Sequence, residues 1–439
     1  MTGLMLSRRT LIQAVVFAGL AVGAGTLASC ARDGGGGGDV AQADVERVAM
    51  STDRSAGSAM FAALAGSLLG EVLRRNAGNV IFSPWSITVA MAMNRAGAAG
   101  ATATQIDAAM HVPSTPTGFL DTAVNTGSQL LDSRNEKVEE GPRSGEVALR
   151  SANSLWARPD VTWKRAYLEM LARYYGAGVR LTDFGGDPEG SRGRINQWVS
   201  DHTERKITDL VPRGAIDSQT ALAVVNAVYF KAPWAEKFEK GLTRQGSFTT
   251  ADGTVKQVAM MHHVVEAALG RTGDDWQAAT LPYLGGKLAM SVLLPTKGRE
   301  TAVAERLSGG GISELLATSG EPMVDLTMPK FDFRSTVALK EVLQALGIDD
   351  AFDPDRADYS GMTDEADLFV SAALHQATIA VDEEGTEATA ATAIVAGVTS
   401  APMPGLTLVL DRPFFLAIID RETRIPIFVG RVADPTQTS

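Results

Sequence analysis

From residue 57 onward, the apolar residues of the chain follow two different spacings. The first segment, residues 57–75, predicts an amphipathic helix. Its apolar side chains lie on one helical face, at Met60, Phe61, Leu64, Leu68, Leu69 and Leu73. Similar patterns predict helices over residues 85–95, 101–110 and 338–352. Pro84 precedes the first of these and suits an initial turn, because its missing N–H would have no partner there.

Other segments have the composition of β-strands. Residues 221–231 read ALAVVNAVYFK, an almost continuous apolar run that suits a strand covered on both faces. Residues 114–145 are polar and predict one short helix in a surface region. Further strand-like stretches lie at residues 79–82, 147–157, 195–199, 281–283, 290–295 and 368–381. Another strand ends at residue 331, and two more lie on either side of a turn at residues 420–424. Strands and helices in this irregular order indicate the α+β class.

The segment over residues 381–415 suits two environments. It opens with three acids and a glycine and ends in a proline-rich turn, as an exposed loop would. Because successive side chains of a strand point to opposite faces, it could also be buried in a sheet. One of its two alternating sets is uncharged: Thr386, Ala388, Ala390, Thr392, Ile394 and Ala396. An ordinary edge strand rich in alanine and threonine is the alternative interpretation.

The first 29 residues have the pattern of an export signal rather than of folded structure. Arg8 and Arg9 precede an uncharged apolar run over residues 11–27, which is similar to a twin-arginine signal. The run is short and glycine-rich for a membrane span, which needs about 20 strongly apolar residues. Residues 27–30 (LASC) are similar to a lipobox, whose Cys30 would be lipidated. A chance cysteine after a Sec-type signal is the alternative.

Residues 30–55 are glycine-rich and polar, and they predict a flexible tether between a lipid on Cys30 and a folded domain at residues 56–439. Cys30 is the only cysteine, so the domain can form no internal disulfide. The formal charge is −11, and removal of the signal with Arg8 and Arg9 would make it −13. So acidic a chain predicts no nucleic-acid partner.

The chain lacks the signatures of common hydrolases and metal sites. It contains neither a G-x-S-x-G nor an H-E-x-x-H pattern. His262 and His263 would point to opposite sides of a strand and form a poor chelate. Residues 353–358 (DPDRAD) lack the third ligand and the glycine of a calcium loop. The residues therefore predict no enzyme, no metal and no cofactor.

Eleven short motifs resemble, in order, those of the serpin family. They are NVIFSPWSI, ANSLW, INQWV, LVP, VVNAVYFK, LPY, MPKF, ADYSGMT, DEEGTEATAATA, DRPFF and GRVADP, and they extend over residues 79–435. The resemblance implies the serpin fold, with helices around a large mixed main sheet, two further sheets and an exposed reactive-centre loop. It also implies an inhibitor of serine proteases, and sometimes of cysteine proteases, that traps its target when the cleaved loop inserts into the main sheet.

The resemblance assigns the run DEEGTEATAATA to the hinge of that loop. The hinge residues would be Glu383, Glu384, Gly385, Thr386, Glu387, Ala388, Thr389, Ala390 and Ala391. Counting seventeen residues from Glu383, as in typical serpins, gives Thr399–Ser400 as the cleaved bond. The alternatives are Val398–Thr399 and Met403–Pro404, the latter disfavoured because proline after a bond resists cleavage. Small residues before the bond favour an elastase-like or subtilisin-like target, and residues 385–410 contain no Arg or Lys for a trypsin-like one.

The resemblance also assigns residues to the places where the main sheet would open. Four match the shutter beneath the opening sheet: Ser83, Ser86, Asn226 and His375. Their hydroxyl, amide and imidazole groups can exchange hydrogen-bond partners as strands separate. Trp234 matches the breach, where insertion would begin, and Arg205 departs from the family by replacing a glycine. Ordinary core packing is the alternative interpretation for the shutter and breach residues.

The predicted function is inhibition of a serine protease outside the cell or at its surface, with the protein exported and lipid-anchored at Cys30. We expect a monomer whose partners are the protease and, through the anchor, the membrane. The alternative is a non-inhibitory serpin-fold binding protein whose loop is cleaved without trapping the protease. Non-inhibitory members often carry a proline or a buried charge in the inserting segment. Residues 386–398 have no proline, and their one charge, Glu387, lies outside the uncharged set.

Overall fold

The structure, a computed structural model, describes residues 40–114, 116–365, 367–387 and 403–438. All of its elements belong to the unit formed by Gly38–Ser439. The predicted signal peptide at residues 1–29, Cys30 and residues 388–402 of the predicted loop lie outside the described residues.

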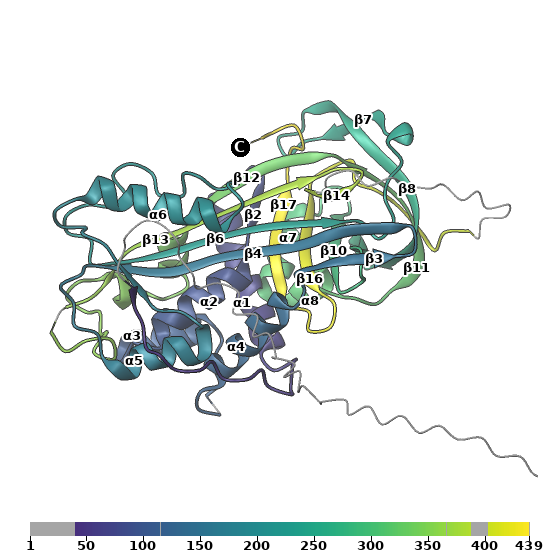
Figure 1. Ribbon diagram of the computed structural model, residues 1–439. Helices are drawn as coiled ribbons and strands as arrows, with labels where there is room; N and C mark the ends of the chain where they lie inside the picture. The colour runs from purple at the N-terminus through teal and green to yellow at the C-terminus, as the bar shows by residue number, and fades with distance from the viewer. Residues whose placement is uncertain (1–39, 115, 366, 388–402, 439) are drawn as a thin grey trace, which may run out of the picture. The chain divides into compact units, whose positions relative to one another are not determined.

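In the described part of the chain, the main sheet contains eight strands in the order β1-β5-β4-β6-β14-β13-β12, with β3 paired to β4 (Figure 1). The strands are β1 (Val40–Ala41), β3 (Glu136–Glu140), β4 (Arg143–Ala157), β5 (Val179–Leu181), β6 (Leu222–Pro233), β12 (Phe331–Ala338), β13 (Val370–Val381) and β14 (Gly385–Thr386). β6 and β13 pair in parallel, whereas β4–β6 and β12–β13 pair antiparallel. The sheet is therefore mixed, as predicted.

A second sheet joins nine described strands in the order β15-β11-β8-β9-β10-β16-β17-β2, with β7 paired to β8. They are β2 (Val80–Phe82), β7 (Arg244–Thr249), β8 (Val255–Thr272), β9 (Trp276–Pro282), β10 (Leu288–Pro295), β11 (Glu321–Pro329), β15 (Leu406–Val409), β16 (Phe414–Asp420) and β17 (Pro426–Val432). The sequence suggested two further sheets. They are continuous here because the 18-residue β8 pairs with β7 and β11 along its length and with β9 at its end.

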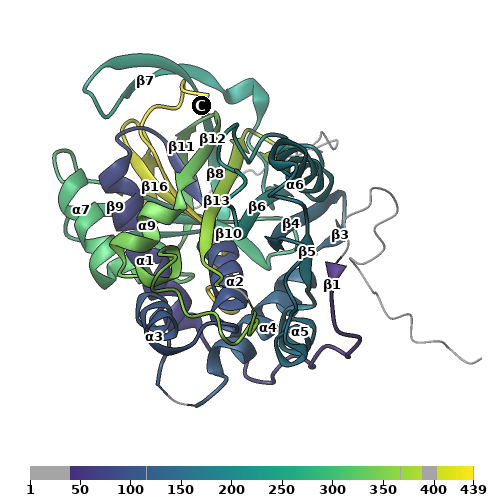
Figure 2. The ribbon, with the colours of Figure 1, turned by 90° about the vertical axis from the view of Figure 1, so that its left-hand side faces the viewer.

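Helices cover both faces of the main sheet. They are α1 (Ser58–Arg75), α2 (Pro84–Arg95), α3 (Gly100–Ala109), α4 (Phe119–Asp132), α5 (Arg165–Met170), α6 (Pro188–His202), α7 (Glu300–Arg306), α8 (Ile312–Leu315) and α9 (Leu339–Ala345). Shorter helical turns are η1 (Leu171–Tyr175), η2 (Lys240–Leu242), η3 (Leu307–Gly311) and η4 (Asp350–Phe352). Figure 2 shows α1 and α2 on one side of the sheet and α6 on the other. No helix in the described ranges is long and apolar enough to cross a bilayer.

The strand β6 contributes to a separate apolar core on each face of the sheet. We call the face packed against α1 and α2 the rear face and the face packed against α6 the front face. Val224 and Phe230 belong to the rear core, and Val225 and Ala227 to the front core. Fully burying a side chain such as valine contributes about 1.5–3 kcal/mol. The predicted burial of β6 on both faces is confirmed.

Residues 195–199, which the sequence analysis predicted as a strand, lie inside the helix α6. Pro188 occupies the first turn, and the Asp187 side chain caps it by accepting a backbone N–H. Ile195 and Val199 are one helical turn apart and both fully buried, so they form the apolar stripe that packs on the sheet. The strand prediction was wrong because the motif is too short to reveal this helical period.

Two other segments differ from their predictions. Residues 114–145 form not one short helix but the 14-residue α4 followed by β3. Residues 338–352, predicted as one helix, divide into α9 and η4. Gly347 lies between them with a left-handed φ of +93°, a conformation that glycine adopts readily and that ends a helix.

Residues 40–55, which the sequence assigned to the flexible tether, run along the folded unit. β1 pairs with β5 at the edge of the main sheet. The Val48 N–H donates to the Arg173 carbonyl at 2.8 Å, and the Val48 carbonyl accepts from Asn125 Nδ2 at 3.0 Å. Arg47 Nε also donates to Asn125 Oδ1 at 2.9 Å. Within the described residues, contacts with the folded unit are therefore made from Val40 onward, before the predicted boundary at residue 56.

We expect Asn125→Ala to loosen residues 40–55, because the buried Asn125 side chain makes two of the hydrogen bonds that hold them. Losing buried hydrogen-bond partners typically costs about 1–3 kcal/mol. Limited trypsin digestion should then cleave after Arg47 faster than in the wild type. Gln197→Ala removes an amide from the exposed side of α6 and should leave that rate unchanged. Equal rates in Asn125→Ala and the wild type would show that this amide does not hold the segment.

Candidate functional site

The four residues predicted to form the shutter meet on the rear face of the main sheet. Ser83 caps the start of α2 and Ser86 lies in its first turn. Asn226 on β6 and His375 on β13 lie directly opposite each other in the parallel pairing. All four residues are fully buried, with exposed fractions of 0%. The fold thus brings together side chains that are far apart in the sequence.

One hydrogen-bond network joins these four residues. His375 Nδ1 donates to Asn226 Oδ1, and His375 Nε2 accepts from the Ser83 backbone N–H at 3.0 Å. Asn226 Nδ2 donates to Ser86 Oγ at 2.5 Å, and the Ser86 N–H donates to Ser83 Oγ at 3.1 Å. A histidine that donates through one nitrogen and accepts through the other is neutral. The network therefore closes the space between β6 and β13 with uncharged groups.

Sequence reasoning missed two members of this network, Ser151 and Asn153 on β4. Asn153 Oδ1 accepts from Ser86 Oγ at 2.6 Å, and Asn153 Nδ2 donates to Ser151 Oγ at 2.8 Å. The ANSLW motif contained a pattern that could have predicted the role of Asn153. Asn153 shares the alternating set of the buried Leu155, and a polar residue in an apolar set indicates a side chain that needs a hydrogen-bond partner.

Burial has a strong electrostatic effect on His375. Removing the ring from water disfavours its charged form and lowers the pKa of His375 to about 3. In the unfolded chain the ordinary pKa of histidine is about 6.5. The folded state therefore binds its proton only in strong acid, whereas an unfolded or solvated ring would bind it near pH 6.

Trp234, the residue predicted at the breach, lies just beyond the end of β6. Its ring is 1% exposed and stacks on Tyr283, with centroids 4.7 Å apart and planes 4° from parallel. Trp234 Nε1 donates to the Asp382 carbonyl at 3.0 Å, and its backbone N–H donates to the Glu384 carbonyl at 2.9 Å. The tryptophan thereby holds the chain where it leaves β13 and turns back toward β6.

Two residues of the predicted hinge form a strand inside the main sheet. Gly385 and Thr386 make up β14, which pairs antiparallel with Pro233 and Ala232 of β6. On its other side Thr386 pairs antiparallel with Val381 of β13. The two long parallel strands are therefore already separated at this end by two residues of the predicted hinge.

This buried start of the hinge requires small residues. Gly385 has a φ of +155°, and a Cβ at this position would lie 2.2 Å from the Ala232 carbonyl oxygen. No larger residue fits unless β6 moves. The Thr386 side chain is buried on the rear face, where its hydroxyl shares a 2.7 Å hydrogen bond with the Tyr283 hydroxyl. The first member of the uncharged set therefore faces the core.

Glu383 is buried between partners from two other segments. Lys330 Nζ lies 2.8 Å from Glu383 Oε2, and Thr243 Oγ1 donates to Glu383 Oε1 at 2.7 Å. Burial alone would raise the pKa of Glu383, but the hydrogen bonds from Lys330 and Thr243 outweigh it and lower the pKa below its ordinary value. Glu383 is consequently charged at neutral pH and fixes the start of the hinge to both partners.

The next acid, Glu384, has its own pair of cations. Lys237 Nζ lies 2.5 Å from Glu384 Oε2, and Lys240 Nζ lies 3.1 Å from Glu384 Oε1. Burial would again raise the pKa of Glu384, and the hydrogen bonds from both lysines outweigh it and lower the pKa. Lys237 and Lys240 belong to no recognisable motif, so this contact could not be predicted from the sequence.

Glu387 faces the opposite side of the sheet from Thr386. Its carboxylate Oε2 lies 2.8 Å from Lys206 Nζ, and its side chain is 10% exposed. Lys206 follows α6, the helix that covers the front face. The alternation predicted from the sequence thus holds at its first two described members, with Thr386 on the rear face and Glu387 on the front face.

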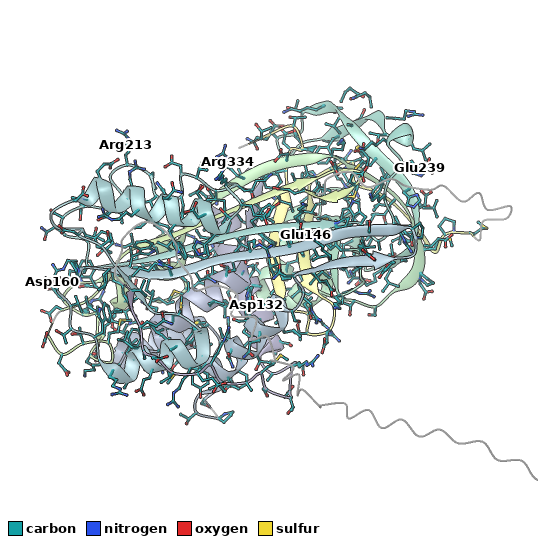
Figure 3. The ribbon with its side chains drawn as sticks, in the orientation of Figure 1. Asp132, Glu146, Asp160, Arg213, Glu239 and Arg334 are labelled. Atoms are coloured by element: carbon teal, nitrogen blue, oxygen red, sulfur yellow. The ribbon has the colours of Figure 1, made fainter. Side chains whose placement is uncertain are left out.

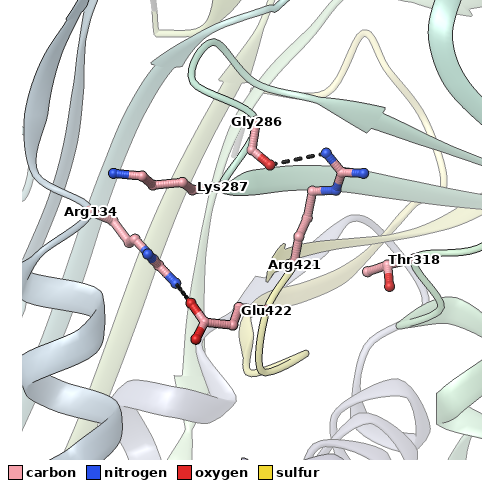
Figure 4. Close-up of a pocket in the computed structure, with 6 residues that line it drawn as sticks. All are labelled: Arg134, Gly286, Lys287, Thr318, Arg421 and Glu422. Carbon is pink, nitrogen blue, oxygen red and sulfur yellow. Dashed lines mark hydrogen bonds and ion pairs between the residues drawn. The ribbon is translucent and has the colours of Figure 1, made fainter. Parts of the chain in front are cut away.

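A surface hollow of about 370 Å³ is lined largely by charged side chains (Figure 4). The lining residues are Arg134, Gly286, Lys287, Thr318, Arg421 and Glu422. Arg421 Nη1 donates to the Gly286 carbonyl at 3.0 Å, and Arg134 Nη2 donates to Glu422 Oε2 at 2.8 Å. These residues provide no nucleophile beside a general base, so the hollow has no catalytic arrangement.

Comparison with known proteins identifies the family. A sequence model of the family described as "Serpin (serine protease inhibitor)" matches residues 60–435. The chain belongs to the serpin family. Antithrombin-III of Ovis aries is 34% identical over 371 residues, covering 82% of this chain and 77% of that protein. Leukocyte elastase inhibitor A of Rattus norvegicus is 33% identical over 366 residues, covering 82% of this serpin and 93% of that protein.

Solved structures agree with this assignment. The thermophilic serpin tengpin in its native state matches with a TM-score of 0.75 at 27% identity, over 90% of this chain and 97% of that chain. An Arabidopsis serpin in its native stressed conformation matches with a TM-score of 0.75 at 26% identity, over 88% and 100%. The predicted serpin fold is therefore confirmed. Serpins are generally protease inhibitors rather than enzymes.

Several residues assigned from the serpin resemblance lie outside the described residues. They are Cys30, the hinge residues Ala388, Thr389, Ala390 and Ala391, and the predicted reactive bond Thr399–Ser400 with its alternative Val398. Their roles stay predictions.

The pKa of His375 predicts that this serpin loses stability in mild acid. Below pH 6.5 an unfolded chain would protonate His375 while the folded protein would not, until the pH approaches 3. The free energy of unfolding should therefore fall by about 1.4 kcal/mol between pH 7.5 and 5.5 from this group alone. Urea unfolding at both pH values measures the loss.

His375→Asn should remove that part of the pH dependence, whatever its effect on stability at pH 7.5. His111→Asn changes an exposed histidine and serves as the matched control, which should keep the full loss. If the free energy of unfolding of His375→Asn fell between pH 7.5 and 5.5 as much as that of the wild type, the assignment of a buried, neutral ring would be contradicted.

Proposed function

We propose that this serpin inhibits serine proteases by inserting its cleaved reactive-centre loop between β6 and β13. The observation that carries the proposal is β14, because Gly385 and Thr386 already occupy the first positions of the strand that would insert. β14 already pairs with both of its neighbours, so the following residues could extend it by the same pairing. The extension requires only that β6 and β13 separate further.

The lengths of the strands support the proposed insertion. Gly385 lies opposite Pro233, the last residue of β6, in an antiparallel pairing. If that register continued one residue at a time, Ala396 would lie opposite Leu222, the first residue of β6. β6 and β13 are each 12 residues long, which equals the segment from Gly385 to Ala396. Cleavage just beyond this segment, near Thr399, would release an arm of the required length.

The same register matches polar hinge residues to polar positions of the sheet. Thr392 would reach the level of Asn226 and His375 on the rear face. Their mutual hydrogen bond must break when the strands separate, and the threonine hydroxyl could then replace it. On the front face, Thr389 would lie beside Thr378, whose buried Oγ1 has no hydrogen-bond partner among the described residues. Cross-strand threonine pairs are favourable in sheets.

Hydrogen bonding favours the inserted form over the intact form. β6 and β13 now share one parallel ladder that runs from the Leu222–Val370 pair to the Val228–Ala377 pair. Insertion would replace it with two antiparallel ladders, and parallel pairing is slightly less stable per residue. The uncharged set would enter the rear core without the cost of burying a charge, which is several kcal/mol. The inserted form would consequently be the more stable one.

The proposed target is an elastase-like or subtilisin-like serine protease, cleaved at Thr399–Ser400 or one residue earlier. The small residues Val398 and Thr399 support this class, and a relative 33% identical is named an elastase inhibitor. We further propose export with a lipid anchor at Cys30, so that residues 31–39 would connect the membrane to β1, which pairs with β5. Several acyl chains would hold such an anchor firmly. The acidic monomer would bind no nucleic acid.

Mixing the serpin with elastase or with subtilisin should give a covalent complex that survives SDS gel electrophoresis. The cleaved serpin released alongside it should resist heat more than the intact protein, because two antiparallel ladders would replace the one parallel ladder between β6 and β13. Cleavage without any stable complex with either protease would contradict the inhibitory proposal and favour the non-inhibitory alternative.

Thr386→Arg should convert the inhibitor into a substrate. The arginine would have to enter the rear core where Thr386 is now 1% exposed, and an unpaired buried charge costs several kcal/mol. The complex should weaken or disappear on the gel while cleavage continues. Thr407→Arg makes the same change on an exposed position of β15 and should inhibit normally. Undiminished complex formation by Thr386→Arg would count against loop insertion.

A further inference from the structure

The hinge residue Glu387 contacts a lysine from the segment that joins α6 to β6. Lys206 Nζ lies 2.8 Å from Glu387 Oε2, with the glutamate side chain 10% exposed and the lysine side chain 49% exposed. The buried ring of Tyr229 on β6 lies beside them, with its centroid 5.9 Å from Lys206 Nζ. A carboxylate so nearly buried is unfavourable without a cation. Lys206 is the ion-pair partner that the described residues supply.

Three residues in an unfavourable backbone conformation converge on this contact. Glu204 and Arg205, immediately before Lys206, have φ values of +50° and +62°, and Glu387 has a φ of +48°. They are half of the six described non-glycine residues with positive φ. Such residues persist only where their surroundings fix them, and they gather at functional sites. The two strained residues Glu204 and Arg205 therefore set the backbone immediately before Lys206.

Loop insertion would require Glu387 to leave this conformation. An extended strand cannot contain a residue at φ of +48°. If the register of β14 continued, Glu387 would lie opposite Lys231 on the same front face. Lys231 Nζ is now 3.8 Å from the carboxylate of Glu146, which Figure 3 labels on the long strand β4. The glutamate would thus exchange one lysine for another as insertion proceeds.

We propose that Lys206 is a positioning residue that holds the hinge at its first step of insertion through its ion pair with Glu387. This role rests on the proposed loop insertion. The pair fixes the residue next to Thr386, so it keeps β14 within the sheet before the loop is cleaved. Without Lys206, the Glu387 carboxylate would lose its ion-pair partner and keep only the hydrogen bond to the Tyr229 side chain. The carboxylate would then move toward water, and Gly385 and Thr386 would leave the sheet with it.

A thiol at position 386 reports on the hinge without any protease. We would combine Thr386→Cys with Cys30→Ser, so that one thiol remains, and measure alkylation by iodoacetamide. Because Thr386 is 1% exposed, the reagent can react only when the hinge leaves the sheet. Lys206→Ala should raise the alkylation rate about 5- to 30-fold, the factor that corresponds to one or two kcal/mol. Lys297→Ala removes a lysine from an exposed loop and should leave the rate unchanged.

Charge reversal separates an ion pair from a general structural role. Lys206→Glu and Glu387→Lys should each speed alkylation, and the two together should restore the slow rate within about twofold. Lys206→Arg should also stay slow, because it keeps the charge. An alkylation rate in Lys206→Ala equal to that of the parent, or a double variant as fast as the singles, would overturn the proposal.

The inhibition assay distinguishes this role from the proposed function. If the parent protein forms no stable complex with elastase or subtilisin while Lys206→Ala still speeds alkylation, the inhibitory function fails and the positioning role stands. If the complex forms but Lys206→Ala alkylates at the parent rate, the positioning role fails and the function stands.

Discussion

The parallel pairing between β6 and β13 is the interaction on which the rest of the structure depends. The other edges of these strands are occupied by β4 and β12, and the proposed insertion would place a new central strand between β6 and β13. Every feature of the candidate site lies along this boundary. The network of Asn226 and His375 closes its middle, Trp234 lies at one end, and β14 has begun to divide it there. A sheet closed by uncharged side-chain hydrogen bonds can open without leaving a charge behind in the core.

Local patterns were sufficient for the elements whose environment is uniform. The apolar run of β6 predicted burial on both faces, because every second residue meets one core and the remainder meet the other. The strand prediction for residues 195–199 was wrong, because the pattern of so few residues cannot distinguish a strand from one face of a helix. The partners at the site were beyond sequence reasoning for a different reason. Asn153 and Lys206 contact the shutter and the hinge through pairings between distant segments, and local sequence does not encode which strands become neighbours.

The segment before residue 56 shows how composition can mislead. Its polar residues suggested a tether, yet the side-chain amide of Asn125 on α4 binds the backbone carbonyl of Val48 and the side chain of Arg47. Backbone groups are alike in every residue, so a polar segment can be held without any apolar pattern of its own. The strand β1 adds a ladder to β5, an edge of the main sheet that would otherwise expose unpaired groups. This edge belongs to the half of the sheet that includes β6.

The acidic residues of the predicted hinge each have cationic partners that favour one register of β14. A strand of two residues has too few backbone hydrogen bonds to fix its own register, and glycine weakens it further. Glu383, Glu384 and Glu387 meet lysines from separate segments, respectively Lys330, the pair Lys237 and Lys240, and Lys206. In a chain with a formal charge of −11, three neighbouring carboxylates would repel one another and the rest of the protein without these cations. A shift of the hinge by one residue would misplace all of these ion pairs and turn Thr386 away from the core. These ion pairs therefore favour one register for a strand whose backbone alone has too few hydrogen bonds to fix it.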